Sequence, residues 1–197
     1  MSESSPEWDR LALSKYRSNY RYGRGRLATN MWAWLGGPLI RFTPHGVTGG
    51  RIFNWLRILV LRMFGAKIGQ GVVINPCSVL LPWHLEIGDD SWVGSDCEIY
   101  NLAPVKIGRN VCISQRVYLC TGNHDYSSPT FELRVGSIEI KDSSWVCAAT
   151  FIAPGVTLNE GSVATAGSIV TSDVPTMAIV RGNPAVFVKR RVIRDEC

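Results

Sequence analysis

The chain has 197 residues, of which 46% are hydrophobic and 19% are charged. This length and composition predict a folded protein with one sizeable core and argue against a disordered chain. No segment is long and uncharged enough to span a bilayer, and residues 1–10 lack the basic start and apolar stretch of a signal peptide, so we expect a cytoplasmic protein. The six cysteines form no CxxC pair, which favours free packed thiols over disulfides or zinc ligands.

The positive charge is concentrated near the N-terminus. Residues 1–67 carry 11 Lys or Arg and 3 Asp or Glu, a balance of +8, whereas residues 68–197 carry 10 and 13, a balance of −3. Residues 15–26 interleave aromatic side chains with basic ones, a pattern that suits phosphates or anionic lipid headgroups. No segment resembles a base-reading motif, so we do not expect nucleic acid as a partner.

Two apolar stretches follow the basic segment. Residues 27–42 are interrupted by Gly-Gly-Pro at 36–38, which predicts at most a short helix before the break. The second stretch is predicted to be a helix over residues 49–64, with Thr48 as its N-cap and Gly65 as its stop. At the helical period its polar residues form a stripe beside a wider apolar arc. We favour a helix that covers the open end of the following β-structure, and contact of the arc with a membrane surface is the alternative interpretation.

From Ile68 the chain follows a six-residue repeat. An aliphatic residue leads each block, and a small or β-branched residue follows four positions later in all blocks but two. This period, with strand-forming leaders, is typical of a parallel β-helix in which three blocks make one triangular coil. The leading side chains fill the interior, and only small residues fit at the corners. The leaders are Ile68, Ile74, Leu80, Ile87, Val93, Ile99, Ile107, Ile113, Leu119, Ile140, Val146, Ile152, Leu158, Ala164 and Val170.

The repeat is broken at length only once, over residues 121–139, where turn formers replace the hexapeptide pattern. A long departure from a strict repeat is a favoured place for function. It begins with His124, between the polar residues Asn123 and Asp125. An imidazole can take a proton from an alcohol and later release it, so these three residues form the candidate catalytic group. A hydrogen-bonded loop histidine is the alternative, and we interpret the other two histidines, His45 and His84, as structural.

Several segments resemble the hexapeptide-repeat acetyltransferases, and most of all the branch of the colanic acid biosynthesis acetyltransferases. They are FGAKIG at 64–69, TGNHDY at 121–126, IAPGVTL at 152–158, AGSIVTSDVP at 166–175 and RGNPA at 181–185. The resemblance covers roughly residues 50 to 192. It implies a left-handed parallel β-helix that assembles as a homotrimer, with active sites between subunits. It also implies acetyl-CoA as the acyl donor, no metal, and a carbohydrate hydroxyl as the acceptor in exopolysaccharide or glycoconjugate assembly.

The resemblance also implies roles for single residues. His124 matches the general base, which activates an acceptor hydroxyl for direct attack on the thioester. Asp96 lies where the galactoside enzymes have an asparagine that contacts the acceptor, so its role is open between a sugar contact and a solvated turn carboxylate. The residues that match the CoA groove are Ala148, Ala166, Gly167, Thr171 and Ser172. Relatives often carry lysine near Ser172, and Lys189 and Arg190 could supply the charge that is missing there.

These inferences divide the chain into three parts. Residues 1–65 form a basic and apolar helical segment that covers the β-helix, residues 66–176 form the β-helix with the loop at 121–139, and residues 177–197 form a short helix or tail. The alternatives are a serine, xenobiotic or amino-sugar N-acyltransferase of the same fold, or a non-enzymatic scaffold. A zinc-dependent carbonic anhydrase of this fold fits poorly, since its metal needs three ligands and only one of the three histidines lies in the excursion. The N-terminal segment is expected to bring the enzyme to the inner face of the membrane.

Overall fold

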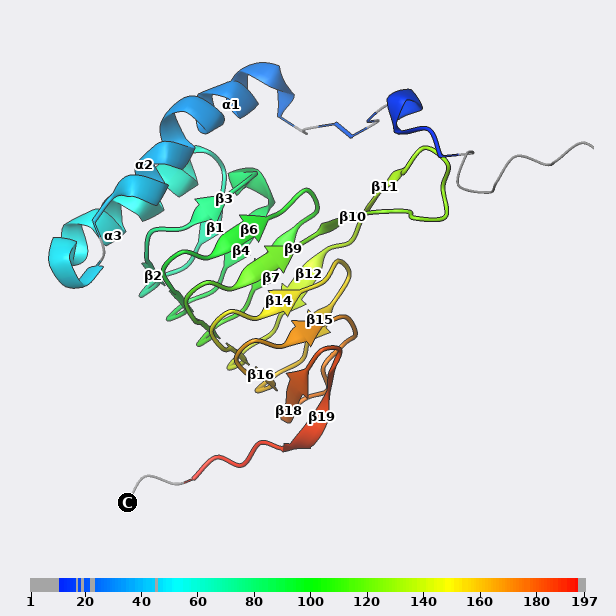
Figure 1. Cartoon of the computed structure of the whole chain (residues 1–197). Coiled ribbons are helices and arrows are strands. Elements are labelled where there is room, and N and C mark those ends of the chain that lie inside the picture. Colours follow the sequence, from blue (N-terminus) through cyan, green and yellow to red (C-terminus); the bar gives the residue numbers. More distant parts are fainter. Residues whose placement is uncertain (1–10, 17, 19, 22–23, 45, 195–197) are drawn as a thin grey trace, which may run out of the picture.

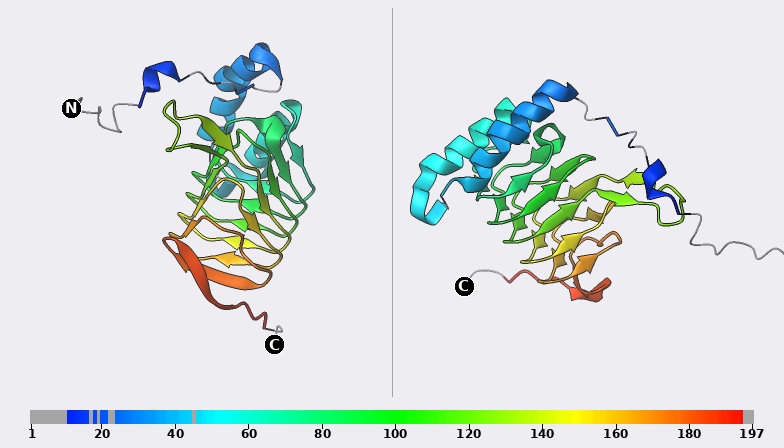
Figure 2. Two further views of the ribbon diagram at one scale, coloured as in Figure 1. Left: turned by 90° about the vertical axis from the view of Figure 1, so that its right-hand side faces the viewer. Right: turned by 45° about the horizontal axis from the view of Figure 1, so that its top comes forward.

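A computed structural model describes residues 11–194 except 17, 19, 22–23 and 45, and for residues 13 and 46–50 it describes the backbone alone. The described chain winds into a parallel β-helix, whose short strands stack as the rungs of a triangular prism (Figure 1). Helices cover the end of the prism where the first coil begins, and a hairpin lies at the other end (Figures 1 and 2). Within the described residues, no helix has the length and apolarity needed to cross a membrane.

Three sheets form the faces of the described prism, and all their pairings are parallel except that of the last two strands. Sheet A contains β1 (Lys67–Ile68), β4 (Leu85–Ile87), β7 (Val105–Ile107), β12 (Ile138–Ile140) and β15 (Thr157–Leu158). Sheet B contains β2 (Val73–Ile74), β5 (Trp92–Val93), β8 (Cys112–Ile113), β13 (Trp145–Val146), β16 (Val163–Ala164), β18 (Ala178–Gly182) and β19 (Ala185–Arg190). Sheet C contains β3 (Ser78–Val79), β6 (Glu98–Tyr100), β9 (Tyr118–Cys120), β14 (Phe151–Ile152) and β17 (Ile169–Val170).

The residues that lead the hexapeptides form the core, which confirms the predicted β-helix. Fourteen of the fifteen predicted leaders are buried. The exception is Leu80: Val79 faces the interior instead and pairs with Ile99. The corner between Ile74 and Val79 is one residue shorter than the repeat, so the prediction was wrong by one position there. The 3-10 helix η4 (Pro82–His84) then brings the chain back into register at Ile87.

Small polar residues close the corners of the prism. Ser144 and Thr150 are each 1% exposed, yet their hydroxyl groups are satisfied by backbone carbonyls. The Ser144 hydroxyl donates to Asn159 O at 2.9 Å, and the Thr150 hydroxyl donates to Cys147 O at 2.7 Å. A hydroxyl buried without a partner would cost free energy, so the small residue at the fifth position serves both steric fit and hydrogen bonding.

The first helical segment is continuous, and the break expected at residues 36–38 is wrong. Helix α1 (Gly25–Met31) passes through one π-helical stretch, η3 (Trp32–Gly36), into α2 (Gly37–Phe42), and the residues at both junctions keep right-handed helical dihedral angles. Pro38 directly follows the π-helical stretch, where the Gly37 N–H donates to Trp32 O and the regular ladder of helical hydrogen bonds is already interrupted. Gly36 is required because a Cβ there would overlap the ring of Trp32, which packs edge-to-face on Phe64.

The second helix, α3 (Gly46–Met63), begins three residues earlier than predicted, so Thr48 lies inside it and is not its N-cap. Its predicted stop is confirmed. Gly65 has a φ of +97°, a left-handed conformation that glycine adopts without strain, and its N–H donates to Arg62 O at 2.9 Å. We refer to α1, η3, α2 and α3 together as the helical cap.

Polar side chains of the helical cap bind the open backbone edge of the first coil. Asn54 accepts from the N–H of Ile74 at 2.8 Å and donates to Val72 O at 3.0 Å. The guanidinium of Arg62 donates to the carbonyl oxygens of residues 68 and 69, at 2.6 and 3.0 Å. The indole of Trp32 donates to residue 79 O at 2.8 Å. Side chains thus replace the strand partner that the first coil lacks, and edge-to-edge pairing is blocked.

The C-terminal segment is a β-hairpin and not the short helix that the sequence allowed. Strands β18 and β19 pair antiparallel, and β18 also pairs with β16 in sheet B. The short connection Gly182–Ala185 and the free edge of sheet B favour a hairpin over an isolated helix. Each added strand provides hydrogen-bond partners for backbone N–H and C=O groups that would otherwise be unpaired at the edge of the sheet.

Candidate active site

The predicted excursion is an antiparallel hairpin that leaves the prism between sheets C and A. Strand β10 (Gly122–His124) pairs with β11 (Leu133–Val135), and His124 lies opposite Leu133. Gly136 closes the base by donating to Thr121 O at 2.9 Å. A Cβ on Gly136 would lie 2.6 Å from the backbone N of Gly155, so the hairpin base rests directly on the turn of the coil below. This contact fixes the hairpin, and with it the histidine, relative to the prism.

One hydrogen bond fixes the tautomer of the His124 ring. The Nδ1 atom lies 2.6 Å from Phe131 O. A carbonyl oxygen can only accept, so Nδ1 carries the hydrogen and donates it. In the neutral ring Nε2 then holds the free lone pair, which is the state required of a general base. The side chain is exposed, so Nε2 is accessible to a substrate.

The side chains on either side of His124 bind backbone N–H groups of the hairpin and do not bind the imidazole ring. The Asn123 side chain accepts from the backbone N–H of His124 at 2.7 Å. The Asp125 carboxylate accepts from the Ser127 N–H at 2.9 Å and forms an ion pair with Arg134 at 2.5 Å. Both predicted residues therefore lie beside the histidine, and their contacts order the backbone that carries it.

The sequence analysis missed Tyr16, which lies against the histidine. Its ring meets the His124 imidazole edge-to-face, with 5.6 Å between centroids. The N-terminal segment is fixed at the hairpin by a hydrogen bond from the Ala12 N–H to Pro129 O at 2.8 Å, and beside the second coil by one from the Tyr20 hydroxyl to Leu102 O. The basic and aromatic run at 15–26 gave no signal for this contact, because a local pattern does not name a partner more than a hundred residues away.

A groove of about 640 Å³ opens beside the hairpin. Its hairpin side is lined by residues 123–127 and 134–136, and its prism side by Ala153, Pro154 and Thr171. His124, the predicted base, and Thr171, a predicted CoA-groove residue, thus line the same cavity. The lining offers an imidazole, hydroxyl groups and a carboxamide, a combination that can bind a polyhydroxylated molecule and abstract a proton from it.

Four other predicted residues lie along a different edge of the prism. We call the turns from sheet B to sheet C the B–C edge, those from C to A the C–A edge, and those from A to B the A–B edge. Ala148 and the pair Ala166–Gly167 occupy successive turns of the B–C edge, where the Gly167 N–H donates to Ala148 O at 2.9 Å. Asp96 lies higher on the same edge, with a φ of +58°. His124 and Thr171 belong to the C–A edge, so the chain by itself does not bring the two groups together.

The B–C edge carries a backbone donor without a partner in the described chain. The structure gives no acceptor for the N–H group of Ala148 among the described residues, whereas the N–H of Ala166 is directed at the Cys147 thiol. On the A–B edge, by contrast, aspartate side chains accept from equivalent turn N–H groups: Asp142 binds the N–H of Arg109 at 2.8 Å. These contacts lower the pKa of the Asp142 carboxyl. Alanine leaves such donors uncovered, and a Cβ on Gly167 would meet nothing within 4 Å, so a ligand can approach this backbone closely.

The candidate phosphate-binding residues are exposed. Ser172 follows Thr171 on the C–A edge. Lys189 and Arg190 lie on the edge strand β19, opposite Ile179 and Ala178. The next residue, Arg191, does not join them, since its guanidinium donates to the carbonyl oxygens of residues 143 and 161 on the A–B edge, at 2.8 and 3.0 Å.

The other histidine and cysteine residues that the structure describes show no sign of nucleophilic or metal chemistry. The Nδ1 of His84 faces Asn101 O at 3.2 Å inside the coil break, whereas His45 and Cys197 lie outside the described residues. The five described cysteines are free thiols. Burial raises the pKa of Cys77 to about 12 and that of Cys97 to about 11, so both stay protonated and inert. The described residues contain no cluster of His, Cys, Asp or Glu that could hold a metal ion.

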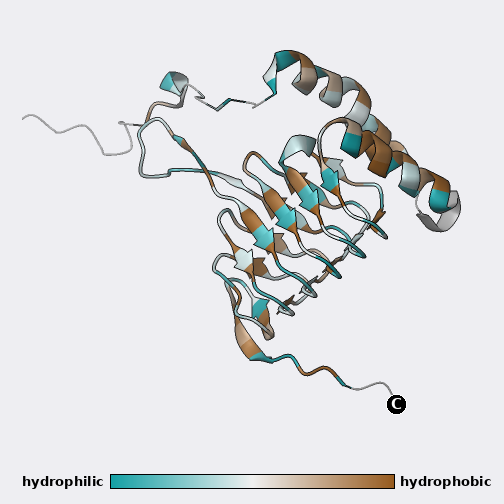
Figure 3. Cartoon of the chain, turned by 180° about the vertical axis from the view of Figure 1, so that it is seen from behind, coloured by the Kyte–Doolittle hydropathy of each residue, from teal (hydrophilic) through white to brown (hydrophobic). Residues whose placement is uncertain are grey.

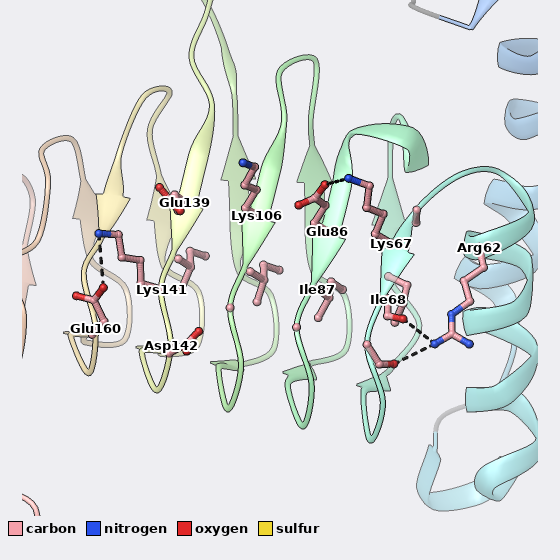
Figure 4. Close-up of a pocket in the computed structure, with 16 residues that line it drawn as sticks. Arg62, Lys67, Ile68, Glu86, Ile87, Lys106, Glu139, Lys141, Asp142 and Glu160 are labelled. Atoms are coloured by element: carbon pink, nitrogen blue, oxygen red, sulfur yellow. Dashed lines mark hydrogen bonds and ion pairs between the residues drawn. The ribbon is translucent and has the colours of Figure 1, made fainter.

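A second, larger groove of about 860 Å³ runs along the outer face of sheet A. Figure 4 shows that charged side chains of alternating sign line it, in the order Lys67, Glu86, Lys106 and Glu139 on successive strands. Lys67 forms an ion pair with Glu86. Opposite charges on neighbouring strands stabilise a solvated sheet face, and the lining contains no imidazole or thiol. We therefore place the chemistry at the hairpin groove and not here.

No family model matches the chain. Its sequence is 44% identical over 171 residues to WcaF of Escherichia coli, which carries the name of a colanic acid biosynthesis acetyltransferase, and the match covers 86% of this chain and 91% of WcaF. It is 32% identical over 141 residues to a protein of Staphylococcus aureus that is named as an acetyltransferase, with 70% of each chain covered.

Solved structures show the same fold. A hexapeptide-repeat acetyltransferase of Vibrio cholerae in complex with acetyl coenzyme A superposes with a TM-score of 0.72 at 23% identity, over 85% of this chain and 88% of that one. A galactoside acetyltransferase in complex with coenzyme A superposes with a TM-score of 0.71 at 23% identity, over 83% and 80% of the two chains. At this identity the likeness establishes the β-helix and no more.

Proposed function

The chain belongs to the hexapeptide-repeat acetyltransferases, and on that premise we propose that it transfers the acetyl group of acetyl-CoA directly to a sugar hydroxyl, with His124 as general base. The observation that supports the proposal most is the bond from Nδ1 to Phe131 O, which leaves Nε2 free in a groove open to solvent. A base must lie within hydrogen-bond reach of the proton that it removes, and this groove offers that position.

The reaction needs no covalent acyl-enzyme. Nε2 takes the proton of the acceptor hydroxyl while its oxygen forms a bond to the thioester carbonyl carbon. The negative charge that develops on the carbonyl oxygen is stabilised by a backbone N–H, for which Ala148 is our candidate. A well-placed donor of this kind contributes on the order of 3 kcal/mol. When the C–S bond breaks, the imidazolium returns the proton to the CoA thiolate, so the enzyme is regenerated.

We further propose that CoA lies along the B–C edge over Ala148, Ala166 and Gly167, and that a second copy of the chain completes the site. The supporting observation is the separation of the B–C edge from His124 by the width of sheet C within one chain. A homotrimer would place the B–C edge of one subunit beside the hairpin of the next. Exposed Trp92 and Trp145, which lie on the two strands of sheet B that flank β8, support contact between copies there, because aromatic residues are enriched at interfaces.

The acceptor that we propose is a saccharide of exopolysaccharide or glycoconjugate assembly, carried on a lipid at the membrane surface. The 44% identity to WcaF supports the pathway class. The groove supports the sugar: its hydroxyl and carboxamide groups can bind sugar hydroxyls, and the exposed ring of Tyr126 can stack on a sugar face. The role of Asp96 at the acceptor is left as a hypothesis that requires the neighbouring subunit.

The test is thiol release from acetyl-CoA with a panel of acceptors. The panel contains sugars, nucleotide sugars and lipid-linked saccharides, together with serine and amino sugars, which test for the alternative acceptors. With the best acceptor, His124→Ala is expected to lower the rate by about a hundredfold or more, as for the loss of a general base. The matched control is His84→Ala, which removes a histidine with a similar bond to a carbonyl oxygen but outside the groove.

Three outcomes contradict the proposal in whole or in part. Release that survives in His124→Ala removes the histidine as the base. Failure of every acceptor, together with failure of acetyl-CoA to bind, favours the non-enzymatic scaffold. A preference for amino sugars over their hydroxyl counterparts replaces O-acetylation by N-acetylation with the same base.

A further inference from the structure

The helical cap carries two stripes of exposed apolar side chains. On the first helix they recur at intervals of three or four residues, and on α3 they do the same, as expected for single faces of helices. The exposed residues of the first helix are Leu27, Met31, Trp34, Leu35, Leu39 and Phe42, and those of α3 are Ile52, Trp55, Leu59 and Met63. Trp34 and Phe42 are 82% and 78% exposed, so these rings have almost no contact with the protein.

Both stripes point away from the β-helix. On the first helix the buried residues Trp32 and Ile40 face the coil, and at the helical period the exposed stripe lies on the opposite side. On α3 the coil-facing residues are Arg57 and Leu61, each 0% exposed, and the exposed stripe is again opposite, with Trp55 at its side, where it also lines a groove of about 780 Å³ between α3 and the first coil. The two helices contact one another, so they form a layer whose outer surface is apolar. Figure 3 shows that apolar residues recur along both helices, with polar residues between them.

The charged residues of the helical cap all have one sign. Between Arg10 and Lys67 the sequence contains 11 basic residues and no acidic one, and the next acidic residue is Glu86. Arg51 is exposed on the helical cap itself, and so is Arg41, which also lines a small pocket with Asp96 and Glu98 of the prism. A second copy of the chain is a poor occupant, because a symmetric contact would bring two cationic surfaces together. A surface that is anionic and also accepts apolar side chains would match both the positive charge and the apolar stripes of the helical cap.

We propose that the outer face of the helical cap docks on the surface of an anionic lipid bilayer, with its helices lying in the plane of the interface. Exposed tryptophan, leucine and isoleucine beside arginine are typical of interfacial helices, which bury their apolar face among lipid headgroups without crossing the bilayer. The arginines add attraction to acidic headgroups.

The docked orientation suits the proposed lipid-linked acceptor. Figures 1 and 2 show that the hairpin with His124 projects from the side of the prism, and that the N-terminal segment leads from the helical cap across to it. A saccharide carried on the same bilayer would therefore reach the groove beside the N-terminal segment. The inference specifies where the proposed enzyme meets the membrane, but the binding surface itself does not depend on acetyl transfer.

The test measures sedimentation of the full-length protein with vesicles, in the absence of acetyl-CoA and acceptor. Vesicles of equal parts phosphatidylglycerol and phosphatidylcholine are compared with vesicles of phosphatidylcholine alone. The double variant Trp34→Ser/Trp55→Ser is expected to lower the partition coefficient by about tenfold or more, because it removes two interfacial anchors. Ile52→Ser/Met63→Ser tests the same face with different side chains.

The matched control is Val186→Ser/Phe187→Ser, which removes two apolar side chains that are 62% and 63% exposed on the hairpin at the opposite end of the prism. Its partition coefficient is expected to stay within about twofold of the wild type. Light scattering without vesicles reports the oligomeric state of every variant.

Equal sedimentation of the two cap variants and the control would overturn the proposal, as would a wild type that stays in the supernatant. Binding to pure phosphatidylcholine as tight as to the anionic mixture, or unchanged binding at high salt, would refute the electrostatic part. If the wild type forms a larger oligomer that only the cap variants dissociate, a second copy covers the face instead. Because no substrate is present, none of these results bears on the acetyl transfer.

Discussion

Replacement of Arg57 by leucine should detach the helical cap from the first coil. The Arg57 guanidinium is 0% exposed, and burial lowers its pKa. It donates to Thr43 Oγ1 at 2.8 Å, to Ile74 O at 2.9 Å and to Pro44 O. One side chain thus links α3, the end of α2 and the open edge of sheet B, with no carboxylate as its partner among the described residues.

The magnitude follows from the exposure of the three acceptors. Ile74 is 1% exposed, so its oxygen would be left without a donor, at a cost of about 1–3 kcal/mol. Thr43 and Pro44 are partly exposed and can bind water instead, so their bonds contribute about 0.5–1.5 kcal/mol each. Leucine also removes a buried charge, which offsets part of the loss. We expect the free energy of unfolding to fall by about 2–4 kcal/mol.

The assay is urea denaturation of the full chain at fixed protein concentration, followed by tryptophan fluorescence, since Trp32 lies between the helical cap and the first coil. Arg51→Leu is the control, because this arginine is exposed on the same helix and its loss should change stability by no more than about 0.5 kcal/mol. If Arg57→Leu unfolds at the same free energy as this control, the buried guanidinium does not hold the helical cap, and the reasoning is wrong.

Two further predictions concern the site. Tyr16→Ala should lower kcat by about threefold to tenfold without raising the KM for acetyl-CoA, because an edge-to-face contact with the His124 ring contributes about 0.5–1.5 kcal/mol to the position of that ring. Tyr16→Phe keeps the aromatic ring, so its kcat should stay near that of the wild type. Equal losses of kcat in the two variants would show that ring packing is not the cause. Ala166→Glu places a carboxylate over the proposed CoA path and should raise the KM for acetyl-CoA at least about tenfold, by charge repulsion and steric block. Steady-state kinetics with varied acetyl-CoA measures this KM, and an unchanged value would exclude the B–C edge as the CoA site.

The sequence determined the β-helix and located His124. The six-residue period identifies, in each block, the side chain that faces the interior. Because each block folds in the same way, the β-helix can be predicted without knowledge of contacts between distant residues. The histidine stood out because it opens the one long interruption of this pattern. The end of α3 was also readable, since Gly65 stops a helix through its own backbone conformation.

Tertiary contacts decided the remaining features. The helix that begins with α1 continues through residues 36–38 because Gly36 makes room for the ring of Trp32, whose indole donates a hydrogen bond to a strand 47 residues away. The contact of Tyr16 with His124, and the hydrogen bonds of Arg57 to the first coil, likewise join segments that are distant in the sequence. The split of the predicted site between two edges of the prism follows from the winding of the coils. A local pattern records the neighbours of a residue along the chain, whereas these features depend on groups that only folding brings within reach.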